Sequence, residues 1–133
     1  MHIGQVALRS GVPAPTIRYY ETKKLISAPS RSRAGYRQYS DRVLDELGFI
    51  RRAQQLDLTL DEIREILALG RAGKRPCERV SAICDAHLAA IDRRLAELQS
   101  FRDNLQAARR LAQGGCGFTP DGFCRAIFAS RER

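Results

Sequence analysis

Residues 3–22 read IGQVALRSGVPAPTIRYYET, and this run has the pattern of two short helices joined by a tight turn. Apolar side chains recur at helical spacing over residues 3–10, and the helix resumes over residues 14–22. Between them, Gly11 permits a left-handed backbone and Pro13 can start the second helix. The pattern indicates a helix-turn-helix, whose second helix enters the major groove of DNA; a generic helical hairpin of an all-α domain is the alternative.

The second helix of this pair has side chains that favour contact with a polyanion. We expect Ile17 to be hidden, while the outward side chains are Thr16, Arg18, Tyr19 and Tyr20. Arginine binds phosphates or guanine edges with paired hydrogen bonds, and tyrosine hydroxyls donate to phosphate oxygens. The helix is therefore a poor core element and a good candidate for lying against nucleic acid.

A basic hairpin is predicted over residues 25–39. Pro29 excludes a regular helix there, Gly35 marks a turn, and the residues after it alternate as in a strand. We expect a small β hairpin, or wing, that contacts the DNA backbone. Its cationic and hydroxyl-bearing side chains are Arg31, Arg33, Tyr36, Arg37 and Tyr39. A solvated charged face is the alternative, and the interleaved tyrosines favour contact with phosphate.

The basic charge of the chain is concentrated in its N-terminal part. The 133 residues carry a formal net charge of +8, and residues 1–52 contain ten Lys and Arg against four Asp and Glu, a net charge of +6. Residues 53–133 contain thirteen against eleven, a net charge of +2. This asymmetry indicates nucleic acid as the partner of the first part and a different role for the rest.

Several classes of protein are disfavoured by what the sequence lacks. No apolar run is long enough to span a membrane, and the first residues do not resemble a signal peptide, so we expect a cytoplasmic protein with no membrane partner. There is no Ser/His/Asp set and no phosphate-binding glycine loop, and the chain has only two histidines. We therefore expect that the protein is not an enzyme.

The chain after the hairpin is predicted to be helical. Helices are expected over residues 41–55 and from a capping box at Thr59 and Glu62 to Leu69. Residues 1–70 then form a winged helix-turn-helix domain that binds DNA, and residues 71–77 form a hinge. The expected fold class is mainly α with a small β wing.

A long dimerisation helix is predicted over residues 78–113, which contain neither glycine nor proline. A helix of these 36 residues is roughly 54 Å long. Its apolar side chains follow steps of three and four residues along a narrow seam: Val80, Cys84, Leu88, Ile91, Leu95, Leu98, Leu105 and Ala112. One short chain cannot bury such a seam, so we expect the helix to pair with its copy in a homodimer; folding back onto the N-terminal domain is the alternative.

Four cysteines are candidates for an effector site: Cys77, Cys84, Cys116 and Cys124. The last two flank a loop of seven residues, and two thiols brought together suit a soft metal ion such as Cu(I), Zn, Cd, Hg or Pb. A disulfide is the alternative, which a reducing cytoplasm disfavours. Cys84 lies on the helical seam and is interpreted as a small core residue, and His87 is either an outer ligand or an ordinary helix residue.

Several motifs resemble, in their order and spacing, the MerR family of bacterial transcription regulators. They are Ile3-Gly4-Gln5-Val6-Ala7, Thr16-Ile17-Arg18-Tyr19-Tyr20-Glu21, Gly35-Tyr36-Arg37-Gln38-Tyr39, Phe49-Ile50-Arg51 and Thr59-Leu60-Asp61-Glu62-Ile63. The resemblance implies that the long helix forms an antiparallel coiled coil and that residues 114–133 hold an effector loop and a tail. It also implies a homodimeric activator that, when its effector is bound, distorts promoter DNA so that RNA polymerase can use it.

In metal-sensing members of this family, a cysteine pair flanking such a loop binds the ion, and sensors of divalent ions add a third cysteine from the partner's long helix. The resemblance therefore implies a divalent soft ion (Hg, Zn, Cd or Pb) held by Cys77 of one protomer with Cys116 and Cys124 of the partner subunit. The 39 residues from Cys77 to Cys116 are about one helical turn more than this family leads us to expect. If the helix continues through that turn, a two-thiol site for Cu(I) or Ag(I) remains. A response to oxidants or electrophiles through the same thiols is a further alternative.

Overall fold

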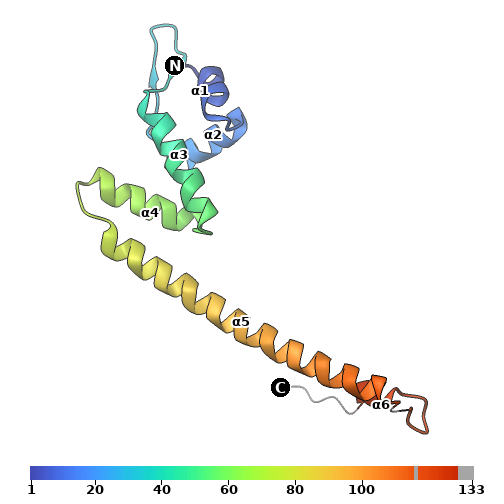
Figure 1. Cartoon of the computed structure of the whole chain (residues 1–133). Helices are drawn as coiled ribbons and strands as arrows, with labels where there is room; N and C mark the ends of the chain where they lie inside the picture. Colours follow the sequence, from blue (N-terminus) through green and yellow to red (C-terminus); the bar gives the residue numbers. More distant parts are fainter. Residues whose placement is uncertain (116, 129–133) are drawn as a thin grey trace. The chain divides into compact units, whose positions relative to one another are not determined.

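The computed structural model describes residues 1–115 and 117–128, and it has the mainly helical fold with a small wing that the sequence predicts. The chain divides into two compact units, Met1–Ile83 and Cys84–Arg133, and one long helix runs through the boundary. The elements labelled in Figure 1 are α1 (Ile3–Ser10), α2 (Ala14–Thr22), β1 (Ser30–Arg31), β2 (Arg37–Gln38), α3 (Arg42–Gln55), α4 (Leu60–Arg71), α5 (Cys77–Gln113) and α6 (Arg125–Phe128).

The predicted helix-turn-helix consists of α1 and α2. Gly11 ends α1 in the left-handed region with φ +73°, and its N–H donates to the carbonyl of Ala7. Pro13 then precedes α2, and its carbonyl accepts from the N–H of Ile17 at 3.1 Å. Because α1 packs against both α2 and α3, the second helix of the motif is held on the face of a three-helix cluster.

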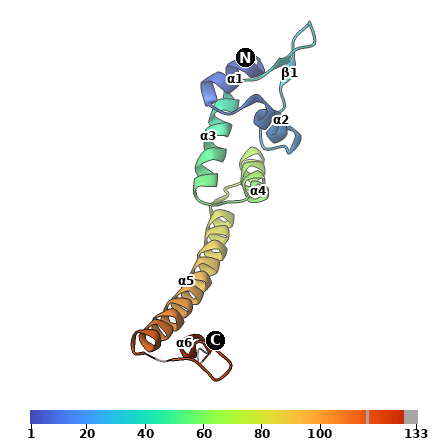
Figure 2. The same ribbon diagram turned by 90° about the vertical axis from the view of Figure 1, so that its right-hand side faces the viewer.

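The predicted wing is the antiparallel pair of β1 and β2. Ser30 lies opposite Gln38 and Arg31 opposite Arg37. Gly35 makes the turn at the tip with φ +84°, a conformation that side chains disfavour. Figure 2 shows the hairpin projecting beyond the helices of the first unit.

The first unit is completed by α3, α4 and the beginning of α5. The predicted capping box starts α4: Thr59 Oγ1 accepts from the Glu62 N–H at 3.2 Å, and Glu62 Oε1 accepts from the Thr59 N–H at 2.8 Å. The helix ends at Arg71, two residues beyond the predicted end. One core cluster unites α1 to α4 with the segment that joins α2 to β1, and its most buried large members are Val6, Ile17, Leu25, Val43, Ile50 and Ile63.

The long helix α5 spans 37 residues, roughly 55 Å at the standard rise. Within α5, all of whose residues are described, Ile83 alone is buried. The apolar side chains of the predicted seam remain open in the single chain: Leu88, Ile91, Leu95, Leu98 and Leu105 are 50–72% exposed. None of the helices in the described part of the chain is long and apolar enough to cross a membrane.

The chain after α5 forms a small hairpin. Ala112 and Gln113 stay helical, and the Gly114 N–H still donates to the carbonyl of Arg110 at 3.0 Å before the chain turns. Phe118 and Cys124 form an isolated antiparallel bridge, which brings the end of the hairpin directly to the start of α6. The stacked rings of Phe123 and Phe128, 5.8 Å between centroids, join the hairpin to α6.

Candidate nucleic-acid interface and metal centre

The outer face of α2 carries three of its four predicted contact residues. Arg18 is exposed, Tyr19 is 48% exposed and Thr16 is half-buried. Lys23 places its Nζ atom 5.7 Å from the centre of the Tyr19 ring, which adds a cation next to these side chains. This face offers donors and positive charge to an anionic partner, while Ile17 on the opposite side is fully buried.

The prediction that Tyr20 faces outward is wrong. Tyr20 is 8% exposed and belongs to the core cluster of the first unit. It follows Ile17 by three residues, and residues three apart lie on the same face of a helix. Its ring therefore packs inward with Ile17, and its contribution to the interface is to anchor α2.

The wing presents four of its five predicted contact residues to solvent. Arg31, Arg33, Tyr36 and Arg37 are exposed. Arg31 donates from Nη1 to the carbonyl of Gly35 at 2.9 Å, so its guanidinium lies along the hairpin turn. These side chains combine fixed positive charge with a phenolic hydroxyl, which suits the oxygens of a phosphate backbone.

The prediction that Tyr39 clamps the DNA backbone is corrected by its burial. Its side chain is 3% exposed, and its hydroxyl donates to Glu21 Oε2 at 2.9 Å. Burial, followed by the hydrogen bond and the charge of Glu21, raises the pKa of Tyr39 to about 12. Arg37 Nε lies 3.8 Å from the other oxygen of the same carboxylate. Glu21 thus ties the end of α2 to the second strand of the wing, a role that the sequence analysis missed.

A buried ion pair was also missed. Among residues 1–115 and 117–128, Glu46 is the one buried charged residue, at 5% exposed, and it pairs with Arg71 at 2.5 Å. The sequence did indicate that Glu46 is buried, because Glu46 follows Val43 by three residues and precedes Ile50 by four on an apolar helix face.

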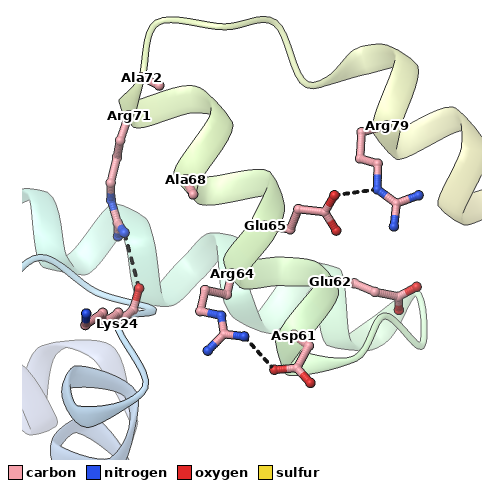
Figure 3. A pocket seen from close by; sticks show the side chains of 9 residues that line it. All are labelled: Lys24, Asp61, Glu62, Arg64, Glu65, Ala68, Arg71, Ala72 and Arg79. Atoms are coloured by element: carbon pink, nitrogen blue, oxygen red, sulfur yellow. Dashed lines mark hydrogen bonds and ion pairs between the residues drawn. The ribbon is translucent and has the colours of Figure 1, made fainter.

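A surface hollow of about 930 Å³ lies beside this pair and is lined by α4, the start of α5 and Lys24. Figure 3 shows that charged side chains on its wall pair with one another: Arg64 with Asp61 at 3.1 Å, and Arg79 with Glu65 at 2.6 Å. Because these charges are already paired, we assign the hollow no ligand.

The two predicted metal ligands that the structure describes lie at the start of α5 and in the hairpin that follows it. Cys77 is its first residue and is exposed, and Cys124 is exposed at the end of the C-terminal hairpin. Cys84 is half-buried, and Cys116 lies outside the described residues. Within one chain, the described residues contain no group of three His, Cys, Asp or Glu side chains placed to hold a metal ion. Exposed thiols suit a soft metal ion, because they lose a proton on binding and become thiolate ligands.

Two family models match the chain. The model described as MerR HTH family regulatory protein covers residues 1–69, which include both helices of the motif and the wing. The model described as MerR, DNA binding covers residues 44–108, which include α4 and most of α5.

Individual relatives match over most of the chain. It is 36% identical over 132 residues to the HTH-type transcriptional regulator ZntR of Escherichia coli, covering 98% of this chain and 92% of the relative. It is 38% identical over 106 residues to the heavy metal-dependent transcription regulator 2 of Rhizobium meliloti, covering 80% of this chain and 72% of the relative. The solved structure of the transcription regulator PbrR691 from Ralstonia metallidurans, in complex with lead(II), matches with a TM-score of 0.71 and 36% identity. The match covers 83% of this chain and 86% of that chain.

Proposed function

Since the chain belongs to the MerR family of transcription regulators, we propose that it is a homodimeric activator controlled by a divalent soft metal ion at its cysteines. The coarser function follows from membership: the protein is a metal-responsive regulator that binds promoter DNA, and it is not an enzyme. The identity of the ion, the ligands, the dimer and the action on RNA polymerase belong to the proposal.

The DNA-binding part of the proposal assigns α2 and the wing to one duplex. Arg18 and Tyr19 face the major groove and its flanking phosphates, and Thr16 supports them from the same helix. The exposed cations of the wing contact the neighbouring backbone. Phosphate contacts position the protein and make its affinity depend on salt, whereas Arg18 is the residue best suited to reading a base edge.

The dimer is supported by the open apolar seam of α5. Leu88, Leu95 and Leu105 are 56%, 58% and 72% exposed in the single chain. A second copy of the helix packed in antiparallel fashion covers this seam and brings the start of each α5 towards the end of its partner. The resulting two-fold symmetry also suits a palindromic DNA site.

The observation that carries the metal assignment is that Cys77 is exposed at the start of α5 and Cys124 is exposed in the hairpin that follows the helix. In an antiparallel dimer, Cys77 of one protomer meets Cys116 and Cys124 of the partner subunit. Three thiolates suit Hg(II) or Pb(II), while Zn(II) prefers a fourth ligand. The lead(II) complex of the similar regulator PbrR691 supports a divalent ion.

One observation favours a monovalent ion as a second candidate. Helix α5 continues to Gln113, so the extra residues between Cys77 and the loop are at least partly helical. Under this second candidate, Cys77 does not reach Cys116 and Cys124 of the partner subunit, and two thiolates remain, which suit Cu(I) or Ag(I).

Bound metal is proposed to act through the shape of the DNA. The dimer holds two half-sites of DNA. A change in the angle between its two winged helix-turn-helix domains twists the intervening promoter towards the geometry that RNA polymerase uses. The deformation energy of that segment then becomes part of the specificity.

Metal titration of the reduced protein tests the proposal. We expect thiolate-to-metal charge-transfer absorbance that saturates at about one Pb(II) or Hg(II) per protomer. Cys77→Ser abolishes this divalent response under the first candidate and leaves a Cu(I) response intact under the second. Cys84→Ser is the matched control and retains both. Absence of absorbance with every ion, together with a reporter response to oxidants or electrophiles, contradicts the metal proposal and favours a redox signal.

A promoter-reporter assay with the same variants separates binding from response. Cys124→Ser is expected to bind an operator selected from a random duplex library with unchanged affinity and to lose activation by metal. Equal loss of operator binding and activation in this variant counts against separate DNA-binding and effector sites.

A further inference from the structure

The segment between α2 and β1 sets how the recognition helix and the wing sit relative to each other. It consists of residues 23–29, and its centre is anchored, since Leu25 is fully buried and Ile26 is 3% exposed. Lys24 takes a left-handed conformation with φ +60°, and the Leu25 N–H donates to the carbonyl of Tyr20 at 2.9 Å. Any shift of this connector moves the wing relative to α2.

Glu46 holds the connector from the side of α3. Its carboxylate accepts from the Ser27 N–H with both oxygens, at 3.3 and 3.1 Å. A carboxylate that is 5% exposed needs a cation as well as hydrogen bonds, because burying an unpaired charge is very costly. Arg71 supplies that cation.

Arg71 holds the same connector from the end of α4. Its Nη2 atom donates to the Leu25 carbonyl at 2.9 Å and to Glu46 Oε2 at 2.5 Å, and its Nη1 atom donates to the Lys24 carbonyl at 3.3 Å. Figure 3 shows the side chain crossing from the last turn of α4 to the backbone of Lys24. One guanidinium therefore fastens two carbonyls of the connector and a buried carboxylate.

Arg71 is also the last residue of α4 before the hinge. The Ala72, Gly73 and Lys74 N–H groups donate back to the last turns of α4, at 3.1, 3.1 and 2.9 Å, and Cys77 then begins α5. Across the hinge, the ion pair of Arg79 with Glu65 joins the first turn of α5 to α4. Helix α4 thus contacts the connector through Arg71, at its end, and the start of α5 through Glu65, near its middle.

We infer that Glu46 and Arg71 form a positioning pair that couples the connector of the recognition helix and wing to the hinge before Cys77. The inference rests on the DNA-binding part of the proposed function and requires no metal. Coupling between two sites is reciprocal, so DNA bound at α2 and the wing must change the hinge through the same pair.

Hydrogen exchange of the full-length protein, with and without saturating selected duplex and without metal, tests this coupling. In the wild type, we expect DNA to slow exchange of the hinge amides at residues 72–74 by about fivefold or more. In Arg71→Met, which keeps the aliphatic stem, DNA still slows exchange in α2, but its effect on the hinge amides falls below about twofold. Glu46→Gln, which keeps the shape of the side chain, gives an intermediate loss.

Arg64→Met is the matched control, because it removes an arginine from the same helix whose partner Asp61 is 88% exposed. It is expected to keep the wild-type response of the hinge. Protection of α2 by DNA in each variant shows that the head is folded. Equal hinge protection in wild type and Arg71→Met overturns the inference, as does a wild-type hinge that does not respond to DNA. Because no metal is added, this result can be interpreted even if the metal proposal fails.

Discussion

Replacing Tyr39 by phenylalanine is expected to remove a specific dependence of stability on alkaline pH. The pKa of Tyr39 is raised to about 12 in the folded protein, first by burial and then by its hydrogen bond to Glu21, against about 10 in an unfolded chain. The unfolded chain therefore releases this proton first as the pH rises. The contribution of Tyr39 is complete below pH ~10 and is lost between pH ~10 and ~12.

The size of this loss follows from the two pKa values. With about two units between the states, the free energy of unfolding falls by about 1.4 kcal/mol between pH 8 and pH 11, and by about 2.7 kcal/mol once both states are deprotonated. At neutral pH, Tyr39→Phe also removes the hydrogen bond to the Glu21 carboxylate, whose side chain is 20% exposed and can rehydrate. We expect that loss to be about 1.5 kcal/mol, the lower end for a bond to a charged group.

Urea unfolding followed by circular dichroism measures both effects, at pH 8 and pH 11 and at one fixed protein concentration. The difference in unfolding free energy between wild type and Tyr39→Phe isolates Tyr39 from the other titrating groups. Tyr36→Phe is the control, because Tyr36 is 71% exposed. If the difference at pH 11 equals that at pH 8, or if Tyr36→Phe reproduces the change, burial and the hydrogen bond to Glu21 do not raise the pKa of Tyr39 in the folded protein.

Three further outcomes are expected from the core, a helix cap and the recognition helix. Ile63→Ala should lower the free energy of unfolding by about 2–5 kcal/mol, because Ile63 is fully buried, whereas Leu8→Ala, at an 86% exposed position, should change it by less than about 0.5 kcal/mol in the same denaturation assay. Thr59→Ala removes one half of the capping box of α4 and should cost about 0.5–2 kcal/mol; no change in the denaturation midpoint would mean that the cap is dispensable. Arg18→Ala should weaken operator binding by about 1–3 kcal/mol with or without metal, measured by fluorescence anisotropy, and an effect seen only with metal would place Arg18 in the response.

The helices and the wing were predictable because their signals are local. Gly11 and Pro13 fix the turn between α1 and α2, and the capping box at Thr59 starts α4 where predicted. The absence of glycine and proline over residues 78–113 likewise gives the long helix, which begins one residue earlier, at Cys77. Each of these features depends on residues within a turn or two of the chain.

The parts that the sequence analysis missed depend on residues far apart in the chain. Tyr39 is buried against Glu21, 18 residues away, and Glu46 pairs with Arg71, 25 residues away. Neither partner is visible in a local pattern, although the place of Glu46 on an apolar face was a usable sign. Tyr20 differs, because its three-residue step from Ile17 was a local sign of an inward side chain, and the prediction of an outward side chain overlooked it. The metal assignment depends on a second chain and stays a prediction.

The unbroken α5 also restricts how this protein can change during evolution. Each residue of a helix advances the chain by about 1.5 Å and turns it by about 100°. Gaining or losing one residue between Cys84 and Gln113 therefore swings the hairpin of residues 117–124 to another side of the rod. Additions of about seven or eleven residues nearly restore the phase. Substitutions can accumulate gradually along this segment, but its length can change only in jumps of whole turns.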